Sequence, residues 1–590
     1  MNKNKDKSSG ISEQLSKMAK SKCLAVVQVA VIGLCTWVLS SSDAYFMPYI
    51  LISAAALVGL FFNLKSTRVY SKTEIITTFG FSLLFSFMVT LANYSLWHAG
   101  GIFGVAKCLL VLFGTFIAFA NIMFFLASRK CICGADASDK SHRKVFLFTF
   151  LLMVVINCAI LFLCKYPGFL SFDSVLQVRQ AVEGHYTNSH PFYHTLILKL
   201  CLTVGLAVFG NMNAAVATYM VFQICFMAMC FAFAVMTLKE VGTPNWSGVL
   251  LVAFFALMPY HLVYSMTLWK DVIFGGFVLL YTVFLYRMLI SVGNGCLNTI
   301  GLILAGFGFC LMRNNGLVAF VGSTLLFLTL FRWQYKKIVL IMAVVILVSF
   351  ALKHPVLKAF GVAQPDITES LSIPLQQVAR DVVENQDFTE EEYYLINQVA
   401  EVERIPETYL PYISDPVKEL LRERNNQQAI SNQKTEYIKL YFSRLLKHPS
   451  TYVKAWVDQT KGYWNSGYSY WIWCLYTDGS ELGICSEVNS GLMNKMVNSY
   501  LSHSTKYFVL KPLVSIGLFV WCILLFLYVS AIRKDKVLAM MAIPSLMVIL
   551  SLLVATPVFS EFRYAYSVFC TMPVIGIMAF IGKKPFNENE

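Results

Sequence analysis

The chain has 590 residues, of which 57% are hydrophobic and only 14% are charged. This composition excludes an ordinary soluble globular protein and indicates a chain that crosses a membrane many times. The formal net charge of +14 would suit a nucleic-acid partner in a soluble protein, but in a membrane protein Lys and Arg collect in cytoplasmic loops. We therefore expect a lipid bilayer around the chain and no nucleic acid as a partner.

Apolar segments of near-spanning length recur along most of the chain. A transmembrane helix needs about 20 apolar residues, and on that basis we expect about fourteen helices, some of them short. The expected ranges are 24–41, 46–64, 75–94, 101–127, 145–164, 213–237, 247–263, 272–291, 299–312, 316–331, 338–352, 507–531, 537–556 and 565–582. The polar break at Arg313 leaves open whether 299–331 is one kinked element or two spans.

Basic residues set the expected orientation. The regions rich in Lys and Arg are 1–22, 65–74, 128–144, 332–337, 532–536 and 583–590. The positive-inside rule places all of them, and so both termini, in the cytoplasm. This holds provided that 191–209 does not span, and we expect that segment to be an amphipathic helix lying on the outer surface. The predicted location is the cell (plasma) membrane, as a multi-pass protein.

These patterns divide the chain into six regions. They are a cytoplasmic N-terminus (1–22), four additional transmembrane helices (23–144), a central transmembrane module (145–352) with an outer loop at 165–212, an extracytoplasmic domain (353–505), C-terminal transmembrane helices (506–582) and a cytoplasmic tail (583–590). Region 353–505 holds 19 of the 33 acidic residues and helical patterns broken by prolines, so we expect a soluble, mainly helical domain. If it is extracytoplasmic, Cys474 and Cys485 could form a disulfide.

A polar island between two apolar stretches is the strongest functional signal in the sequence. It begins at Tyr166-Pro-Gly, carries Asp173 and continues through Gln177, His185 and His190. A carboxylate at the mouth of a membrane bundle is costly unless it is paired or has a function. Asp173 could act as a general base or a metal ligand, or it could simply cap the helix that begins there. The island therefore predicts an active-site loop at a membrane surface.

Three further turns carry charge on the same expected face. They are Trp269-Lys270-Asp271, Arg313-Asn314-Asn315 and Glu561-Phe562-Arg563-Tyr564. Asp173 and Asp271 could hold a divalent cation such as Mg²⁺ or Mn²⁺ and leave positions for a phosphate, which Lys270, Arg313 and Arg563 could bind. The alternatives are ion pairs between Lys270 and Asp271 and between Arg563 and Glu561.

Other cofactors are not indicated. His185, His190 and His194 lack the spacing of a zinc-binding helix. No Walker loop, G-x-S-x-G elbow or G-x-G-x-x-G fingerprint is present in a convincing context. Apart from the divalent cation we expect no cofactor, which argues against an ATP-driven pump and against a nucleotide-sugar enzyme of the Rossmann type.

The order of these motifs resembles that of the GT-C superfamily of polytopic membrane glycosyltransferases. Asp173 resembles the acidic motif of the first outer loop, and Asp271 corresponds to the acidic residue of the second. His190-Pro-Phe-Tyr-His-Thr-Leu-Ile-Leu, ending in Phe209-Gly, is similar to the surface helix of the protein-mannosyltransferase-like and aminoarabinose-transferase-like branches. Glu561-Phe-Arg-Tyr resembles their late Arg-Tyr motif. The resemblance covers residues 145–582 and suggests a bacterial subfamily of unassigned substrate.

Two positions depart from the family pattern. Many relatives carry a second acidic residue in the first loop, where this chain has Ser174, and Phe192 replaces the second proline of the His-Pro motif. The missing acidic residue puts metal dependence in doubt.

The resemblance implies an all-α GT-C-like bundle and inverting transfer of a sugar from a polyprenyl-phosphate donor. The acceptor would be an extracytoplasmic glycan, glycolipid or protein. Asp173 would be the general base, and Lys270, Arg563 and Arg313 would bind the donor phosphate. Gln177, His185, His190, Tyr564 and Trp471 would contact substrate. The rival interpretations are a lipid-linked-sugar flippase or transporter, an O-antigen-type polymerase or ligase, and a non-catalytic sensor.

Overall fold

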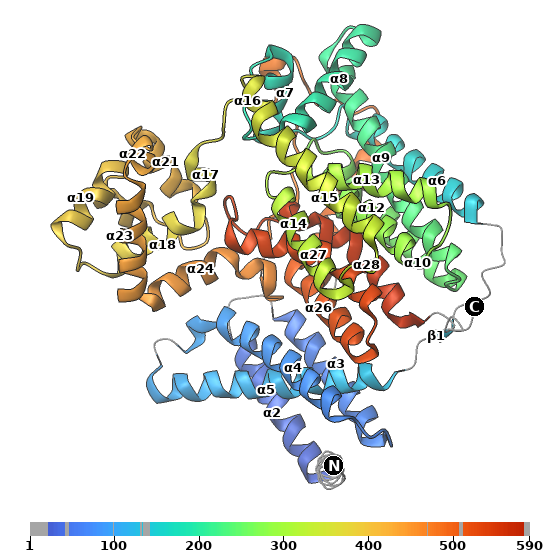
Figure 1. Ribbon diagram of the computed structural model, residues 1–590, viewed down its shortest axis with the longest axis vertical. Coiled ribbons are helices and arrows are strands. Elements are labelled where there is room, and N and C mark those ends of the chain that lie inside the picture. The colour runs from blue at the N-terminus through green and yellow to red at the C-terminus, as the bar shows by residue number, and fades with distance from the viewer. Residues whose placement is uncertain are drawn as a thin grey trace.

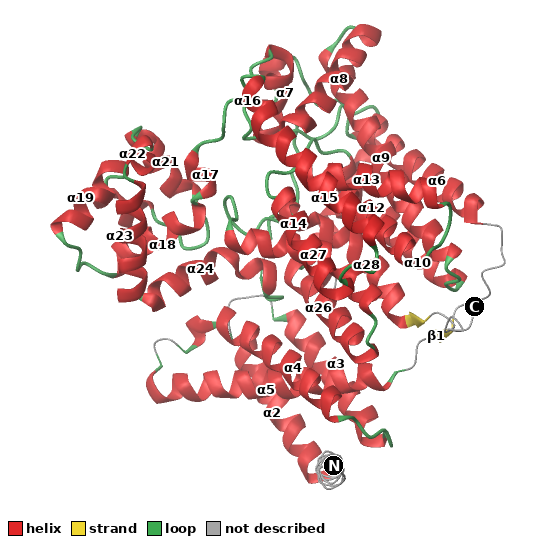
Figure 2. Cartoon of the chain, in the orientation of Figure 1, coloured by secondary structure: helices red, strands yellow, loops and turns green. Residues whose placement is uncertain are grey.

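The structure is a computed structural model that describes residues 22–41, 46–97, 100–129, 132–133, 142–468, 470–506 and 511–582. The ends 1–21 and 583–590, and most of the basic loop 128–144, lie outside the described residues, so their cytoplasmic placement stays a prediction. The described chain is almost wholly helical (Figure 2). One short pairing within it joins β1 (Ile132–Cys133) to β2 (Ile581–Gly582).

Twelve helices in the described residues are long and apolar enough to cross a membrane, which makes the chain a polytopic helical membrane protein. They are α2 (Lys22–Ser40), α3 (Met47–Lys65), α4 (Lys72–Ala92), α5 (Gly101–Ser128), α6 (His142–Cys164), α8 (Phe192–Phe209), α9 (Met212–Glu240), α12 (Lys270–Leu289), α15 (Lys336–Ala351) continued by η2 (Leu352–Val356) and α16 (Leu357–Ala359), α26 (Ile516–Arg533), α27 (Lys536–Val554), and η6 (Arg563–Ala565) continued by α28 (Tyr566–Phe580). Short turns η1 (Tyr94–Leu96) and η5 (Lys511–Val514) lie beside them.

The expected segments coincide with these helices except in three regions, 191–209, 247–263 and 299–331. Segment 247–263 is a pair of helices, α10 (Asn245–Leu257) and α11 (Pro259–Ser265), bent by 57°. Pro259 explains the bend, because it lacks the N–H that would continue α10 and disfavours a helical conformation at Met258, which is extended.

Segment 299–331 forms two helices and not one kinked element. α13 (Gly295–Leu311) and α14 (Gly316–Phe331) are joined by a turn at residues 312–315. They fold back on each other, since the rings of Phe309 and Phe320 lie 5.6 Å apart on either side of the turn. The pair packs against α12 and α27, and in the turn between α13 and α14 Arg313 is buried whereas Asn314 is exposed.

α8 differs from the amphipathic helix expected at 191–209, because most of its exposed side chains are apolar. Leu196, Leu200 and Val204 form its exposed side, while His194 and Thr195 are buried. The helix has the length and composition of a span, and its exposed face suits lipid and not water. Figure 1 shows α8 at one edge of the molecule, next to α9. The orientation that requires α8 not to span stays a prediction.

The first four helices form a bundle of their own, coloured blue in Figure 1. Its core includes Phe85 and Phe119, whose rings stack 4.5 Å apart. Trp521 of α26 packs edge-on against both rings, and Tyr49 donates a hydrogen bond to Asn465 at 2.9 Å. These contacts attach the bundle to the C-terminal helices.

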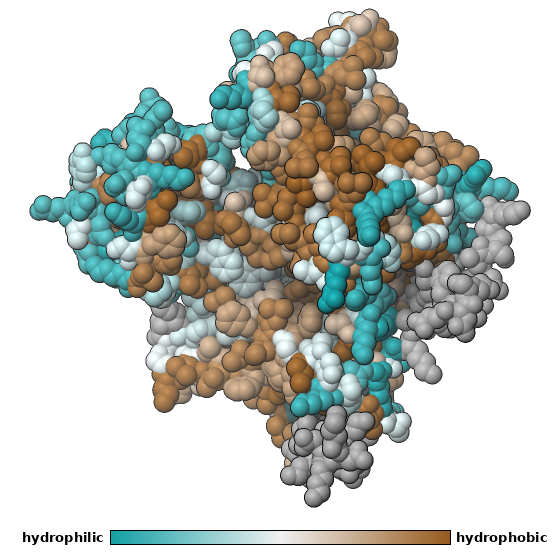
Figure 3. Space-filling view, viewed as in Figure 1, coloured by the Kyte–Doolittle hydropathy of each residue, from teal (hydrophilic) through white to brown (hydrophobic). Residues whose placement is uncertain are grey.

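Residues 367–447 fold into a helical lobe with its own apolar core. It consists of α17 (Ile367–Ser370), α18 (Ser372–Glu384), α19 (Glu390–Val399), η3 (Val402–Arg404), α20 (Ile405–Thr408), α21 (Asp415–Arg424), α22 (Gln428–Asn432) and α23 (Lys434–Lys447). Figure 1 shows the lobe to one side of the membrane helices, and Figure 3 shows its largely hydrophilic surface. α24 (Pro449–Trp464) joins the lobe to the bundle, because it packs against both α18 and α26.

Residues 470–490, which we call the cover segment, connect this region to α25 (Gly491–Lys506). They contain one helical turn, η4 (Ser480–Leu482). Their backbone pairs with the loop that follows α6: the Glu487 N–H donates to the Tyr166 carbonyl at 2.8 Å, and the Asp478 N–H donates to the Leu170 carbonyl at 2.9 Å. The cover segment therefore lies over the polar island, although the two are far apart in the sequence.

The cover segment does not contain the disulfide that the sequence allowed, since Cys474 and Cys485 are both free thiols. Cys474 is turned inward and donates to the Tyr476 carbonyl at 3.3 Å, whereas Cys485 is exposed.

Candidate functional site

Four turns that are far apart in the sequence meet at one end of the membrane bundle. They are the start of α7 (Phe172–Glu183) with Asp173, the start of α12 with Lys270 and Asp271, the α13–α14 turn with Arg313, and the residues leading into α28 with Glu561 and Arg563. We call these six side chains the charged cluster. Ion pairs join them across these elements.

Arg563 is the centre of the cluster. One of its Nη atoms lies 2.6 Å from Asp173 Oδ2, and its Nε contacts the carboxylate of Glu561. The guanidinium also lies over the ring of Trp269 at 5.2 Å and over the ring of Tyr564 at 5.0 Å. Ion pairs and ring faces together fix its plane. The pair with Glu561 was an expected alternative, and it exists alongside the pair with Asp173.

Asp173 is the accessible member of this group. Its side chain is 37% exposed, compared with 11% for Arg563 and 7% for Glu561. It does not cap α7, because Ser171 is the N-cap and forms a capping box with Ser174. Burial alone would raise the pKa of Asp173, but the charges of Arg563 and Lys270 outweigh it and hold that pKa well below its ordinary value.

Lys270 faces a neutral histidine. Its Nζ lies 3.2 Å from His190 Nδ1, and His190 is buried. Burial, followed by the positive charge of Lys270, lowers the pKa of His190 to about 3. The neutral imidazole therefore presents its Nδ1 lone pair to the ammonium, and its proton is on Nε2.

Asp271 pairs with Arg313, not with Lys270 as one alternative proposed. Arg313 Nη1 lies 3.0 Å from Asp271 Oδ1 and donates to the Tyr564 carbonyl at 2.9 Å. Among the described residues, no group makes a hydrogen bond of good geometry to either oxygen of Asp271, although its side chain is 1% exposed. The end of α12 thus carries a buried carboxylate with spare acceptor capacity.

The donor set does not fit a divalent cation in this arrangement. The two carboxylates expected to hold it each face a guanidinium, and the described residues contain no group of three His, Cys, Asp or Glu side chains placed to bind a metal. The cluster also brings together three cationic side chains, Lys270, Arg313 and Arg563, of which the two guanidiniums are paired with carboxylates.

Gln177 is a structural link, not a free substrate contact. Its amide donates to Thr195 Oγ1 at 2.9 Å and lies 2.8 Å from His194 Nδ1. His194 Nε2 contacts the Tyr219 hydroxyl at 2.8 Å, and Tyr219 donates to Gln223. This direction of donation makes His194 the neutral Nε2–H tautomer. The relay ends where Gln223 donates to backbone carbonyls of residues 264, 265 and 267, just before Lys270.

The other residues predicted to contact substrate, Tyr564, Trp471 and His185, lie at different places relative to the charged cluster. Tyr564 is buried, and both Arg563 and Arg313 lie over its ring. Trp471 of the cover segment is 43% exposed and packs on Trp269, with ring centroids 5.8 Å apart. His185 is exposed and, in the described part of the chain, its side chain forms no hydrogen bond or ion pair with the cluster. Trp471 is therefore placed to meet a ligand above the cluster, whereas His185 is not.

Sequence reasoning missed Lys353 and the role of Trp269. Lys353 Nζ donates to the carbonyls of Cys310, Arg313 and Asn314 at 2.9–3.1 Å, and so caps the end of α13. An ionisable residue at the end of an apolar helix is a signal that could have found it. Trp269 donates to Ser171 at 2.9 Å and thereby ties the start of α12 to that of α7.

Comparison with known proteins gives one match. A family described as "Family of unknown function (DUF6020)" matches residues 179–589, which include five members of the charged cluster and begin after the first four helices. No curated protein and no solved structure matches the chain.

Proposed function

This chain belongs to the DUF6020 family, and we propose that it is an integral membrane glycosyltransferase. It moves a sugar from a polyprenyl-phosphate donor to an extracytoplasmic acceptor. The observation that carries the proposal is the accessible carboxylate of Asp173, which lies beside a fixed guanidinium and an ammonium at one end of a membrane bundle. An acceptor hydroxyl and a lipid phosphate need that combination of a base and cations in one place.

The proposed reaction is a single inverting displacement. Asp173 accepts the proton of the acceptor hydroxyl while the hydroxyl oxygen forms its bond to the anomeric carbon. The bond from that carbon to the phosphate oxygen breaks, and polyprenyl phosphate leaves with the electron pair. Lys270 and Arg563 stabilise the negative charge that develops on the leaving phosphate, with Arg313 behind them. No step requires a metal.

The low pKa of Asp173 in the free protein is compatible with this role. A base is most effective when its pKa is near the working pH, and Arg563 and Lys270 keep the pKa of Asp173 well below that range. A donor phosphate bound by the same two cations would share their charge. Its own negative charge would raise the pKa of Asp173. Donor binding thus activates the base.

The rival functions place their charges differently. A transporter binds its substrate near the bilayer midplane, on broken helices, whereas the charged cluster lies at helix starts and in one helix–helix turn. A polymerase or ligase of the O-antigen type would use the same kind of lipid-phosphate donor. It would differ from the proposed enzyme in the acceptor that receives the sugar. The exposed ring of Trp471 above the cluster favours an enzyme that holds a sugar.

The test is the sugar composition and linkage of the cell envelope in a deletion strain that re-expresses either the wild type or Asp173→Asn. We expect one sugar to be missing in the deletion and to return with the wild type alone. Asp415→Asn is the matched control, because Asp415 also lies in the first turn of its helix and pairs with a cation, Lys418, at 2.8 Å. If Asp173→Asn restores the missing sugar, Asp173 is not the general base. If the deletion leaves the envelope sugars unchanged, the flippase or the sensor is favoured.

A further inference from the structure

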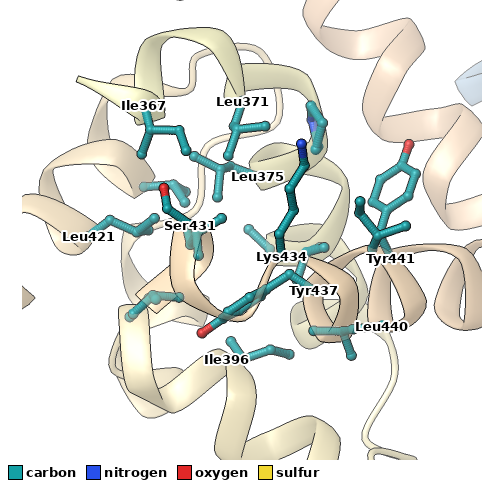
Figure 4. Close-up of a pocket in the computed structure, with 18 of the residues that line it drawn as sticks. Ile367, Leu371, Leu375, Ile396, Leu421, Ser431, Lys434, Tyr437, Leu440 and Tyr441 are labelled. Atoms are coloured by element: carbon teal, nitrogen blue, oxygen red, sulfur yellow. The ribbon is translucent and has the colours of Figure 1, made fainter. Parts of the chain in front are cut away.

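The helical lobe contains an apolar cavity that the proposed function does not use. Its volume is about 610 Å³, which falls in the range of small-molecule sites. Figure 4 shows aliphatic side chains from opposite sides of the lobe pointing into it, among them Leu375, Ile396 and Leu421. The cavity is open on one side, so part of its apolar wall faces water, and covering that wall with an apolar ligand is favourable. The cavity therefore has the character of a binding site.

The cavity opens to the surface along α23. Its inner wall is formed by fully buried core residues such as Leu421, which is 1% exposed, whereas Ile438 and Phe442 at its edge are 46% and 54% exposed. Leu446, one turn beyond Phe442, is 80% exposed. Residues four apart lie on one face of a helix, so an apolar stripe leads from solvent into the cavity. An elongated apolar ligand can enter along this stripe.

A single charged side chain lines the cavity, Lys434. It is exposed, and among the described residues no carboxylate pairs with it. Figure 4 shows its side chain extending from α23 toward the side of the cavity where Leu371 and Leu375 lie. The apolar wall and the one cation at its edge together select an amphipathic ligand with an apolar body and an anionic head.

The position of the lobe identifies the source of such a ligand. α24 packs on α18, which lines the cavity, and also on α26 and α4 of the membrane bundle, so the lobe that holds the cavity is attached to helices with the length and composition of membrane spans. We infer that the cavity binds one alkyl chain of a membrane lipid and that Lys434 pairs with the anionic headgroup. This site is separate from the charged cluster and does not depend on glycosyl transfer.

The test uses the full chain in phosphatidylcholine vesicles with a hexadecyl phosphate probe that carries a diazirine near the end of its chain. After irradiation, mass spectrometry locates the labelled residues. We expect label on the cavity wall, in the peptides that contain Ile396 and Leu421. Unlabelled hexadecyl phosphate should compete for the site and inorganic phosphate should not. Label confined to the membrane helices would overturn the inference.

Two pairs of variants make the test specific. Lys434→Glu should reduce labelling of the cavity about two- to fivefold, as expected for an exposed ion pair, while Lys439→Glu, on the same helix but outside the cavity, should leave it unchanged. Ser431→Trp narrows the opening and should reduce labelling at least about tenfold, while its neighbour Asn432→Trp should not. Equal labelling within both pairs would overturn the inference.

Two further competitors separate the head from the chain. Neutral hexadecanol should compete about two- to fivefold less well than hexadecyl phosphate if Lys434 reads the anionic head, and equal competition would overturn that role. Compared at equal free concentration in water, alkyl phosphates of decreasing length should compete about fourfold less well for each methylene removed. Competition that does not depend on chain length would exclude burial of the chain in the cavity.

Discussion

At the scale of single residues, Arg563 makes more ion pairs within the charged cluster than Arg313 does. It pairs with two carboxylates and stacks on two rings. Burial raises the pKa of Glu561, and Arg563 opposes that rise. Glu561 is therefore a buried acid that depends on one guanidinium for its charge.

This dependence predicts a coupled effect on stability. Arg563→Gln leaves Glu561 buried without a partner and should destabilise the protein by about 3–5 kcal/mol. The same substitution made in a Glu561→Gln background should cost distinctly less, because no buried charge is left unpaired. Thermal unfolding of the two single variants and the double variant measures the coupling. Strict additivity would mean that the Arg563–Glu561 contact carries no stabilising energy.

The conservative change at the same position separates charge from geometry. Arg563→Lys keeps the positive charge but cannot hold two carboxylates in one plane. We expect a loss of about 10²–10³-fold in kcat with a smaller change in KM, as for the removal of one transition-state donor. Steady-state kinetics with a defined donor and acceptor provide the measurement. Full activity of the Lys variant would show that Arg563 contributes its positive charge alone and that its planar geometry is not needed.

Asp173 gives a prediction about pH. Its pKa in the free protein lies well below the ordinary value of about 3.9, so it stays ionised there and kcat/KM should not fall on the acid side until the pH is well below 4. The donor phosphate raises this pKa, so kcat should decline at a higher pH than kcat/KM does. The stabilisation from the lowered pKa is present above about pH 4 and is lost as the pH falls toward the folded value. Matching acid limbs in the two profiles would contradict donor activation of the base.

At the scale of elements, hydrogen bonds from Lys353 hold the α13–α14 turn that carries Arg313. Lys353 lies in η2, a wider turn that contains Pro355, and such turns often occur at functional positions. It caps the carbonyls at the end of α13 and so fixes Arg313 opposite Asp271. Arg313 is thus positioned by η2, which follows it in the sequence after α14 and α15.

Lys353→Met should therefore loosen the turn. The lost hydrogen bonds from a charged donor should destabilise the protein by about 1.5–3 kcal/mol and raise the KM for the donor more than they lower kcat. Lys336→Met is the matched control, since Lys336 is an exposed lysine at the start of α15, the helix that η2 continues. An unchanged KM in the Lys353 variant would show that Arg313 does not need this cap.

At the scale of the whole molecule, the sequence predicted the membrane helices well because apolar length is a local property. It also predicted that Asp173, Lys270, Asp271, Arg313 and Arg563 share one face, since helix ends can be counted along the chain. The sequence could not predict which charged residues form ion pairs. Asp271 pairs with Arg313 and not with its neighbour Lys270, because α12 packs on α13.

Two differences between expectation and structure have the same origin. The polar residues of segment 191–209 looked like a water-facing side, but tertiary hydrogen bonds bury them. Gln177 looked like a substrate contact, but it begins a relay to α9. A single sequence cannot distinguish a polar side chain that waits for a ligand from one that a neighbouring helix already satisfies.

The distance along the chain between Asp173 and Arg563 has a consequence for biosynthesis. The two residues are 390 positions apart, which at roughly 5–20 residues per second corresponds to roughly 20–80 seconds of translation. Throughout that interval the nascent protein holds Asp173 in the membrane region without its guanidinium, and for most of it without the roof of residues 470–490. The charged cluster is therefore complete only once the residues that lead into α28 have been made, so the proposed site forms late in synthesis.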